Sequence, residues 1–508
     1  MLELLKNSLV EFFGFSSNQP WLFTQLSFWI FFTIVIGIYS FFYQKVRARN
    51  VYLLLISLFF YYKTGGWFLV LLIYSCVSNY SWGYFIGTFH RKSLKRLVLI
   101  LGLLSNFGLL IYFKYAYFLT GILNHFTGDA YETYNWLAQW WNAVSTAQID
   151  ASSIILPIGI SFFTFQSVSY LIDVYRGHSP VVKNIFDFSF YLSFFPQLVA
   201  GPIVRASSFI PQIYRTYKLS KREFSHALFL ILAGLIKKMV ISDYLALNFI
   251  DRIFDQPGSY TGAENLMAIY AYALQIYCDF SGYTDIAIGV ALMLGFKLPL
   301  NFNSPYKAVS LTDFWRRWHI SLSSWLRDYL YIPLGGNRKG KIRTYINLMI
   351  TMLLGGLWHG ANIKFVIWGG IHGLGLVFEK ALGPIRKKIP VTWSTRLLSM
   401  FFTYQLVSFA WLFFRADSIE QAWLMALQIV YSLRFSDMWS FLQLYPMVAG
   451  LMFAGYTIHL LPSHWQEFVR GQFIQWPLWV KGIVVLAILY LINSFLLADI
   501  QAFIYFRF

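Results

Sequence analysis

Long apolar runs recur along this whole chain, and most of them reach or approach the length of a membrane-spanning helix. Charged residues make up only 12% of the sequence, about half of the share that soluble domains carry. Such a chain cannot cover a water-exposed surface of this size. The runs therefore predict an all-α, polytopic integral membrane protein, a single domain over residues 1–508, with roughly 10–12 transmembrane helices of about 20 residues each.

Short clusters of Lys and Arg separate the apolar runs and account for the net charge of +18 through the positive-inside rule, without a nucleic-acid ligand. They lie near residues 45–49, 91–96, 215–222, 339–343 and 386–388. Segment 120–150, in contrast, contains Asp129, Glu132 and Asp150 but no Lys or Arg. We expect this segment to be a loop on the outer side of the membrane, opposite to the basic clusters.

Several apolar runs contain a predicted turn or break. We expect a first span over 22–43, a hairpin over 51–87 that turns at Gly65 and Gly66, a kinked or re-entrant segment over 190–205, and paired spans within 344–381 that meet at "WHGAN". Three further spans are expected near 395–414, 442–461 and 476–498.

Segment 310–341 is basic, aromatic and amphipathic. The spacing of Ser310 and Asp313 predicts a helix start, and Pro333 predicts its end. One face is apolar and carries Trp315, Trp318, Leu322, Trp325 and Tyr329, and another carries Thr312, Arg316, His319, Ser323 and Arg327. The simpler interpretation is an interfacial helix that anchors in anionic lipid headgroups; the alternative is a site for a phosphorylated donor.

A histidine, His359, lies inside the apolar stretch "LLGGLWHGANI". Gly355, Gly356 and Gly360 share its helical face, which permits either a closely packed helix or room for a bound chain. Ionisable groups inside a membrane are costly and indicate function by default, although an interhelical hydrogen bond is the structural alternative. Burial favours the neutral imidazole, which is the form that a general base needs. His372, in "GGIHGLG", has the same features, and spacing alone does not rank the two.

Two acids, Asp279 and Asp285, lie in the apolar stretch "QIYCDFSGYTDIAIG" (275–289). They could pair with Arg316 or Arg317 or with Lys237 and Lys238, or they could line a proton path; pairing is the simpler expectation. The sequence has no spacing typical of a metal site, and Cys76 and Cys278, both in apolar context, indicate neither a disulfide nor a zinc site.

The chain resembles the membrane-bound O-acyltransferase (MBOAT) family, and most closely its bacterial branch of alginate O-acetylases and D-alanyl-transfer proteins. The stretches that carry the resemblance are "SFFTFQSVSYLIDVYRG" (161–177), "FFPQLVAGPIVR" (194–205), residues 275–289, "NFNSPYKAVSLTDFWRRWHISLSSWLRDYLYIPLGGNRKG" (301–340), "LLGGLWHGANIKFVIWGGIHG" (353–373) and the closing "FIYFRF" (503–508). The likeness covers roughly residues 50–380 as the family core, and spans over 395–498 follow it.

The resemblance implies a central tunnel through the protein, an acyl-CoA donor, expected to be acetyl-CoA, that enters from the cytoplasm, and no tightly bound cofactor. It implies an inner-membrane enzyme that acts in exopolysaccharide or cell-wall glycan O-acetylation with a periplasmic or membrane-anchored SGNH-type acetyltransferase as partner. The residues that it implies are His359 and His319 as catalytic, Arg316, Arg317, Trp315 and Ser323 at the donor, and Asp279, Asp285 and Asn362 as supporting polar groups.

Two other functions remain open from the residues alone. A transporter or flippase would move an intact substrate without any acyl bond changing hands. A non-catalytic assembly component of a membrane complex would tolerate histidine substitutions but not changes in loop 120–150.

Overall fold

The computed structural model describes residues 14–15, 21–145, 150–386, 388–495 and 503, and over these ranges its regular structure is entirely helical. The first half contains α2 (Leu26–Tyr39), α3 (Val46–Gly65), η1 (Gly66–Phe68), α4 (Leu69–Thr88), α5 (Lys92–Leu110), η2 (Ile111–Tyr115), α6 (Ala116–Thr127), α7 (Trp136–Val144), α8 (Ile160–Arg176), α9 (Ile185–Ser193), α10 (Phe195–Leu198), α11 (Ala206–Ile213), α12 (Lys221–Leu235), η3 (Ile236–Ser242), α13 (Asp243–Leu245), η4 (Ala246–Ile250), α14 (Asp251–Asp255) and η5 (Pro257–Ser259).

The second half contains the long helix α15 (Gly262–Met293), then η6 (Pro305–Lys307), α16 (Leu311–Arg317), α17 (Ile320–Leu326), η7 (Arg327–Tyr331), α18 (Gly340–His359), α19 (Ile363–Ala381), α20 (Gly383–Arg386), α21 (Trp393–Arg415), α22 (Ile419–Ser432), α23 (Phe435–Leu444), α24 (Pro446–Leu460), α25 (Ser463–Gln475) and α26 (Leu478–Phe495). Lys387 and residues 504–508 of the closing motif lie outside the described residues.

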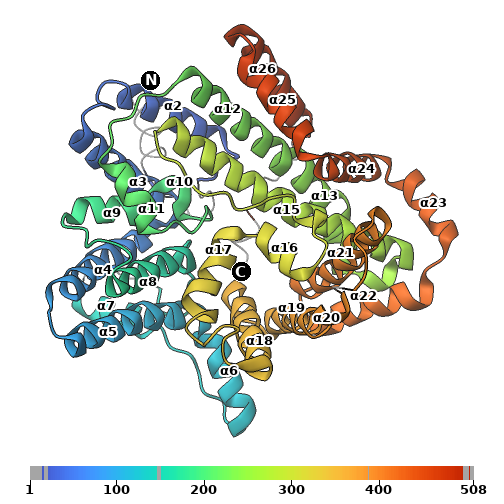
Figure 1. Ribbon diagram of the computed structural model, residues 1–508, viewed down its shortest axis with the longest axis horizontal. Helices are drawn as coiled ribbons and strands as arrows, with labels where there is room; N and C mark the ends of the chain where they lie inside the picture. Colours follow the sequence, from blue (N-terminus) through green and yellow to red (C-terminus); the bar gives the residue numbers. More distant parts are fainter. Residues whose placement is uncertain (1–13, 16–20, 146–149, 387, 496–502, 504–508) are drawn as a thin grey trace.

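The helices form a ring around the short helices α16 and α17 (Figure 1). In this view α12 and α15 lie above them, α3, α4, α5 and α8 lie to the left, α18 and α19 lie below, and α21 and α22 lie to the right. Phe503 is 2% exposed and stacks on Tyr283 of α15. The segment on which the family resemblance is strongest therefore occupies the centre of the protein.

Among the described residues, five helical stretches are long and apolar enough to cross a membrane: Val46–Thr88, Lys92–Thr127, Lys221–Asp255, Trp393–Arg415 and Leu478–Phe495. The pair α23 and α24, bent by 101° at residue 445, would make six. This number is below the roughly 10–12 crossings expected from runs of about 20 residues. Two segments that the sequence predicts as spans are not among these stretches. α2 has only 14 residues, which is too short to cross a membrane, and two carboxylates in the middle of α15 lower its hydropathy.

Three of the expected breaks are present. The helical stretch from 46 to 88 turns at Gly66, whose φ of 59° is easily adopted only by glycine. Residues 194–205 form the short helix α10 followed by a buried, non-helical segment. The helices α18 and α19 are separated by residues 360–362, where Asn362 caps the N-terminus of α19.

Glycines allow α18 and α19 to pack backbone against backbone. A Cβ atom on Gly356 would lie 2.1 Å from the carbonyl oxygen of Phe365, and one on Gly369 would lie 2.3 Å from that of Met352. A Cβ on Gly360 would meet the ring of Phe365 at 2.1 Å. The glycine-rich stretch thus serves close helix packing, which is the first of the two alternatives that the sequence left open.

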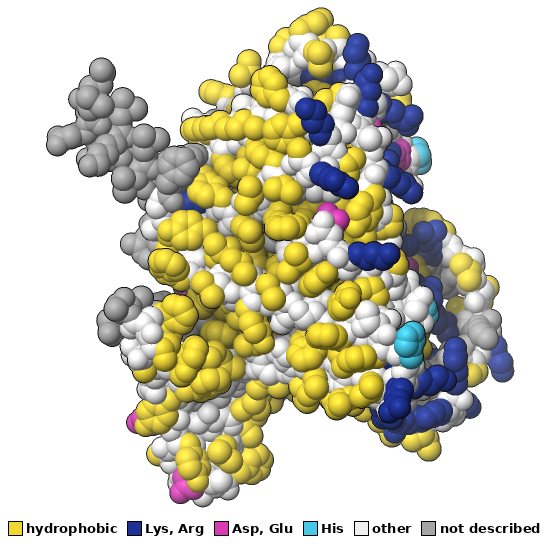
Figure 2. Space-filling view, turned by 90° about the vertical axis from the view of Figure 1, so that its left-hand side faces the viewer, with side chains coloured by type: hydrophobic (Ala, Val, Ile, Leu, Met, Phe, Trp, Pro, Cys, Tyr) yellow, Lys and Arg dark blue, Asp and Glu magenta, His cyan; other side chains and the backbone are white. Residues whose placement is uncertain are grey.

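Charged side chains are distributed unevenly over the surface. Figure 2 shows Lys and Arg side chains gathered along one edge of the protein, with hydrophobic side chains over most of the remaining visible face and acidic side chains at the opposite lower edge. Such a separation agrees with the sidedness expected from the positive-inside rule.

The prediction of one continuous interfacial helix over 310–332 is wrong. Ser310 does cap a helix start, and helical structure ends before Pro333, but the helix is interrupted at residues 318–319. The aromatic stripe is buried in the protein rather than placed at headgroup level, because Trp315, Trp318, Trp325 and Tyr329 are all less than 10% exposed.

Candidate active site

His359 is the last residue of α18 and lies at the tip of the α18–α19 hairpin, away from the basic residues at the hairpin's other end. Its side chain is 3% exposed. The imidazole is surrounded by aromatic rings, with centroid distances of 5.0 Å to Trp358, 5.1 Å to Trp368 and 5.2 Å to Phe414. Three helices, α18, α19 and α21, therefore fix its surroundings.

A cavity of about 80 Å³ borders His359. Another part of its wall is formed by residues 156–162, which lead from the acidic segment 120–150 into α8, and Lys114, Val199 and Trp358 complete the lining. Because segment 120–150 is expected on the outer side, we expect this part of the cavity wall to face that side of the membrane.

His319 lies at the break between α16 and α17 and is fully buried. Its φ of 41° is in the left-handed region, which is strained for a residue other than glycine and is found most often at functional sites. Asn301 sustains the break, because its backbone oxygen accepts from the N–H of Ile320 at 2.9 Å and its side chain accepts from the N–H of Ser321 at 3.2 Å. The turn directs the imidazole inward, so His319 does not share an exposed face with Arg316 and Arg327, as the helical pattern predicted.

The indole of Trp358 lies close to both histidines. The ring of Trp358 lies 5.9 Å from His319 and 5.0 Å from His359. Residues that are 40 positions apart in the sequence are thus brought next to one side chain, so both motif histidines belong to the same candidate site.

His372 belongs to the same aromatic cluster but lies farther along α19. Its ring is 4.8 Å from Trp368 and 5.1 Å from Trp315, and it is 1% exposed. Unlike His359, it is not among the residues that line the cavity. The geometry therefore ranks His359 above His372 as the group that can reach a substrate.

Sequence reasoning missed Lys114 and Tyr115. Both lie in the π-helical turn η2, inside the candidate span Lys92–Thr127. The ammonium of Lys114 donates to the carbonyl oxygens of Trp358 at 2.7 Å and His359 at 3.1 Å, and the hydroxyl of Tyr115 donates to that of Leu357 at 2.8 Å. A single lysine in the apolar stretch "IYFKYAYF" was the available signal.

The four residues expected at the donor have separate surroundings. Arg316 is exposed on α16, whereas Arg317 bonds Asp313 at 2.9 Å and helps to hold the local fold. Trp315 is 9% exposed and contacts His372. The hydroxyl of Ser323 donates to the carbonyl oxygen of Trp318 at 3.0 Å. Of the four, Arg316 alone presents its charge to an incoming anion.

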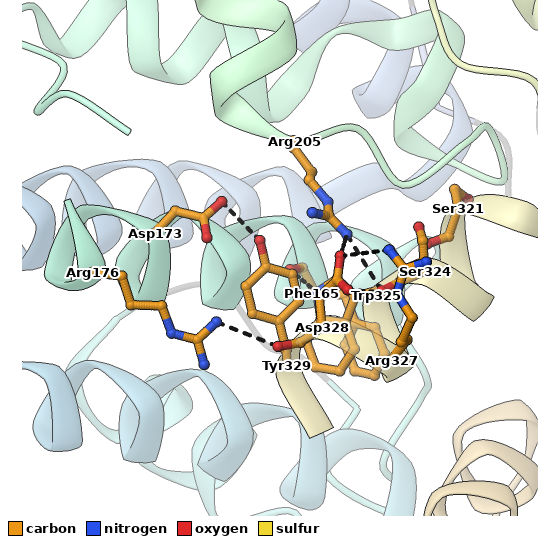
Figure 3. Close-up of polar contacts among 10 residues, drawn as sticks. All are labelled: Phe165, Asp173, Arg176, Arg205, Ser321, Ser324, Trp325, Arg327, Asp328 and Tyr329. Atoms are coloured by element: carbon orange, nitrogen blue, oxygen red, sulfur yellow. Dashed lines mark hydrogen bonds and ion pairs between the residues drawn. The ribbon is translucent and has the colours of Figure 1, made fainter. Parts of the chain in front are cut away.

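A group of charged residues fastens the segment after α17 to its neighbours (Figure 3). Asp328 accepts hydrogen bonds from Arg327 and Arg205, and the hydroxyl of Tyr329 donates to Asp173 at 2.7 Å. The guanidinium group of Arg205 lies 5.2 Å from the centroid of the Tyr329 ring. We call these five residues the arginine clasp. Burial raises the pKa of the Asp328 carboxyl, but the bonds from Arg327 and Arg205 outweigh this effect and lower the pKa overall.

The acids of α15 pair with lysines of η3, as the simpler expectation held. Lys237 lies 2.6 Å from Asp285, and Lys238 lies 2.6 Å from Asp279 and 2.7 Å from Asp243. We call these five residues the lysine–aspartate network. They hold α15 against η3, and the predicted pairing with Arg316 or Arg317 is not what the structure shows. Asn362, the third supporting residue, caps α19.

Over the described ranges, no group of three or more His, Cys, Asp or Glu side chains is arranged to hold a metal ion. Three groups are available for chemistry at this site: the imidazole of His359 next to a cavity, the imidazole of His319 near the same indole, and the ammonium of Lys114 bonded to the helix end.

The family model of membrane-bound O-acyltransferases matches residues 97–416. The chain is 42% identical over 401 residues to a probable alginate O-acetylase of Pseudomonas aeruginosa, covering 78% of this chain and 72% of the relative. It is 38% identical over 425 residues to a peptidoglycan O-acetyltransferase of Helicobacter pylori, with 77% of each chain covered. A teichoic acid D-alanyltransferase of Streptococcus thermophilus is 30% identical over 292 residues, or 52% of this chain and 69% of the relative.

This chain belongs to the membrane-bound O-acyltransferase family. It is a multi-pass membrane protein and an acyltransferase, as the sequence resemblance implied.

Proposed function

We propose that the protein transfers an acetyl group from a cytoplasmic acyl-CoA donor to a hydroxyl group on the extracytoplasmic side, for the O-acetylation of a polysaccharide. The observation that carries this proposal is the position of His359. It forms the wall of a cavity beside the segment that follows the outer loop, while His319 approaches the same indole from the basic segment 310–341.

The reaction needs one proton acceptor at this position. The imidazole of His359 takes the proton from the acceptor hydroxyl as its oxygen attacks the carbonyl carbon of the thioester. A new C–O ester bond forms, the C–S bond breaks, and the imidazolium returns the proton to the leaving thiolate. Surrounding aromatic rings exclude water, which would otherwise compete for the thioester.

The relatives support the acetyl group and the polymer. The two of higher identity are named for O-acetylation of alginate and of peptidoglycan, and the relative named for D-alanyl transfer is less similar. We therefore assign this chain an acetyl donor and a glycan acceptor, reached directly or through a partner acetyltransferase of the SGNH type.

The donor side is assigned to the basic edge. Arg316 is exposed in the basic segment 310–341, and guanidinium groups match phosphate oxygens such as those of coenzyme A. Arg317, Trp315 and Ser323 contribute by holding α16 and α17 in place around His319 rather than by contacting phosphate.

Membrane vesicles that carry the protein, its acceptor polymer and the gene products encoded beside it would test the proposal. With acetyl-labelled coenzyme A, His359→Ala should reduce label in the polymer by about 10²–10⁴-fold, the typical worth of a general base. The matched control is His372→Gln, a buried histidine of the same aromatic cluster that does not line the cavity. Labelling at the wild-type rate in His359→Ala, with the protein present in the membrane, would refute the catalytic assignment.

A further inference from the structure

The end of α18 is an unusual place for a helix to stop. The last carbonyl groups of a helix have no partner within the helix, and inside a membrane protein water is not available to bond them. Here three consecutive carbonyl oxygens, those of residues 357–359, accept hydrogen bonds from the side chains of Lys114 and Tyr115. Both donors come from the turn η2, which is 240 or more positions away in the sequence.

The ammonium of Lys114 is fully engaged. It has three N–H donors, and three acceptors lie within reach: the carbonyl oxygens of Trp358 and His359 and the hydroxyl oxygen of Ser161 at 3.5 Å. It also lies 5.9 Å from the centroid of the Trp358 ring. Lys114 thus holds the peptide groups before and after the Cα atom of His359, and it links them to η2 and α8.

The turn that presents these donors is itself irregular. Residues Ile111–Tyr115 form a π-helical turn inside the apolar stretch Lys92–Thr127, and such turns occur frequently at functional sites. A lysine inside such an apolar stretch is costly and indicates a functional role by default.

We propose that Lys114, together with Tyr115, is a positioning residue that fixes the end of α18 and so aims the imidazole of His359 into the cavity. This inference rests on the catalytic role proposed for His359. Lys114 acts through the backbone of residues 358 and 359, to whose carbonyl oxygens its ammonium donates.

Lys481 offers a matched control. Its ammonium is also buried, at 5% exposure, and it donates to the hydroxyl of Ser225 at 2.6 Å and to the carbonyl oxygen of Ile474 at 3.0 Å. It lies on α26 and contacts neither α18 nor the cavity lining. Loss of its hydrogen bonds therefore reports the general cost of removing a buried lysine.

Steady-state kinetics separate positioning from folding. In Lys114→Met we expect kcat to fall by about 10–10²-fold, the effect of a displaced catalytic group, with KM for the donor within twofold of wild type. Lys114→Arg, which retains the charge and the donors, should recover part of kcat, and Tyr115→Phe should lose severalfold. Lys481→Met should keep kcat. Unchanged kcat in Lys114→Met, with His359→Ala inactive, would overturn the positioning role and leave the proposed function intact.

A measurement that does not depend on activity completes the test. Diethyl pyrocarbonate modification of His359, followed by mass spectrometry and referred to the exposed His178, should be at least threefold slower in Lys114→Met and in Tyr115→Phe than in wild type. Equal rates would overturn the inference. If His359→Ala keeps its activity, the proposed function fails, and the modification rates alone decide whether Lys114 orients this ring.

Discussion

Two regions of this protein bury ionisable side chains among apolar helices, and they do so in opposite ways. In the lysine–aspartate network of η3 and α15, each ammonium lies within 2.7 Å of a carboxylate. At the tip of the α18–α19 hairpin, His359 is enclosed by aromatic rings and borders a cavity.

The difference distinguishes buried charges that stabilise the fold from a buried imidazole that can take part in a reaction. A buried charge is tolerated when an opposite charge and hydrogen bonds compensate for its lost hydration, and a network of this kind holds helices together without reaching a substrate. An imidazole can be buried in its uncharged form and stay available for proton transfer. Burial alone therefore does not identify an active site, and the neighbouring cavity is what makes His359 the candidate.

The largest stability effect is expected in the lysine–aspartate network. Lys238→Met leaves Asp279 and Asp243 without their ion pair and should lower the free energy of unfolding by about 3–5 kcal/mol. Titrated unfolding of the purified protein in detergent, followed by tryptophan fluorescence, measures this change. Adding Asp279→Asn and Asp243→Asn to the same chain should restore much of the loss. Equal stability of Lys238→Met and wild type would break the comparison.

The hairpin should be next in sensitivity. Gly369→Val introduces a side chain whose Cβ atom would lie 2.3 Å from the Met352 carbonyl oxygen. Overpacking of this kind costs about 1–3 kcal/mol. Acetyl transfer should fall as well, because the tip that carries His359 is displaced. The adjacent Gly370→Ala is the control, since its Cβ would meet Leu353 at an ordinary 3.7 Å. Similar behaviour of the two variants in unfolding and transfer assays would contradict the packing argument.

The backbone at His319 should give an effect of about 1 kcal/mol. Because φ is 41° there, His319→Gly should be more stable than His319→Ala by roughly 1 kcal/mol, while both variants lose acetyl transfer if the imidazole takes part in it. Unfolding midpoints and transfer rates for the pair measure the two effects separately. An alanine variant as stable as the glycine variant would show that the left-handed turn is not maintained in the membrane.

The smallest effect is expected in the arginine clasp. Asp328→Asn should cost about 0.2–1 kcal/mol, as is usual for partly exposed ion pairs. Since the pKa of Asp328 is lowered in the folded protein, its contribution is present above about pH 4 and is lost as the pH falls through the lowered value. The stability difference between wild type and variant should shrink on acidification between pH 5 and pH 3. A constant difference over this range would contradict the assignment.

Local patterns predicted several features correctly. The turn at Gly66, the cap at Ser310, the break after His359 and the pairing of Asp279 and Asp285 with Lys237 and Lys238 all follow from rules that act within a helix or between helices that must bury their charges. The two motif histidines were identified by family resemblance, and the structure brings them to one indole.

Other features depend on contacts that no local pattern reveals. The break at residues 318–319 has no glycine or proline, and Asn301, from a separate loop, supplies the hydrogen bonds that stabilise it. A periodic pattern therefore placed His319 on a polar face, when a reversal of the backbone buries it. The role of Lys114 likewise depends on the end of α18 lying beside η2, and the sequence around Lys114 does not indicate this contact.

The backbone contact between α18 and α19 also limits how the enzyme can move. No side chain lies between Gly356 and the Phe365 backbone or between Gly369 and the Met352 backbone. Because the two helices cannot slide or separate without opening a void, we expect the hairpin to move as one rigid body. We therefore expect any widening of the cavity to come from residues 156–162, which form another part of its wall and whose first four residues precede α8. The ring of His359 would keep its position while that segment moves.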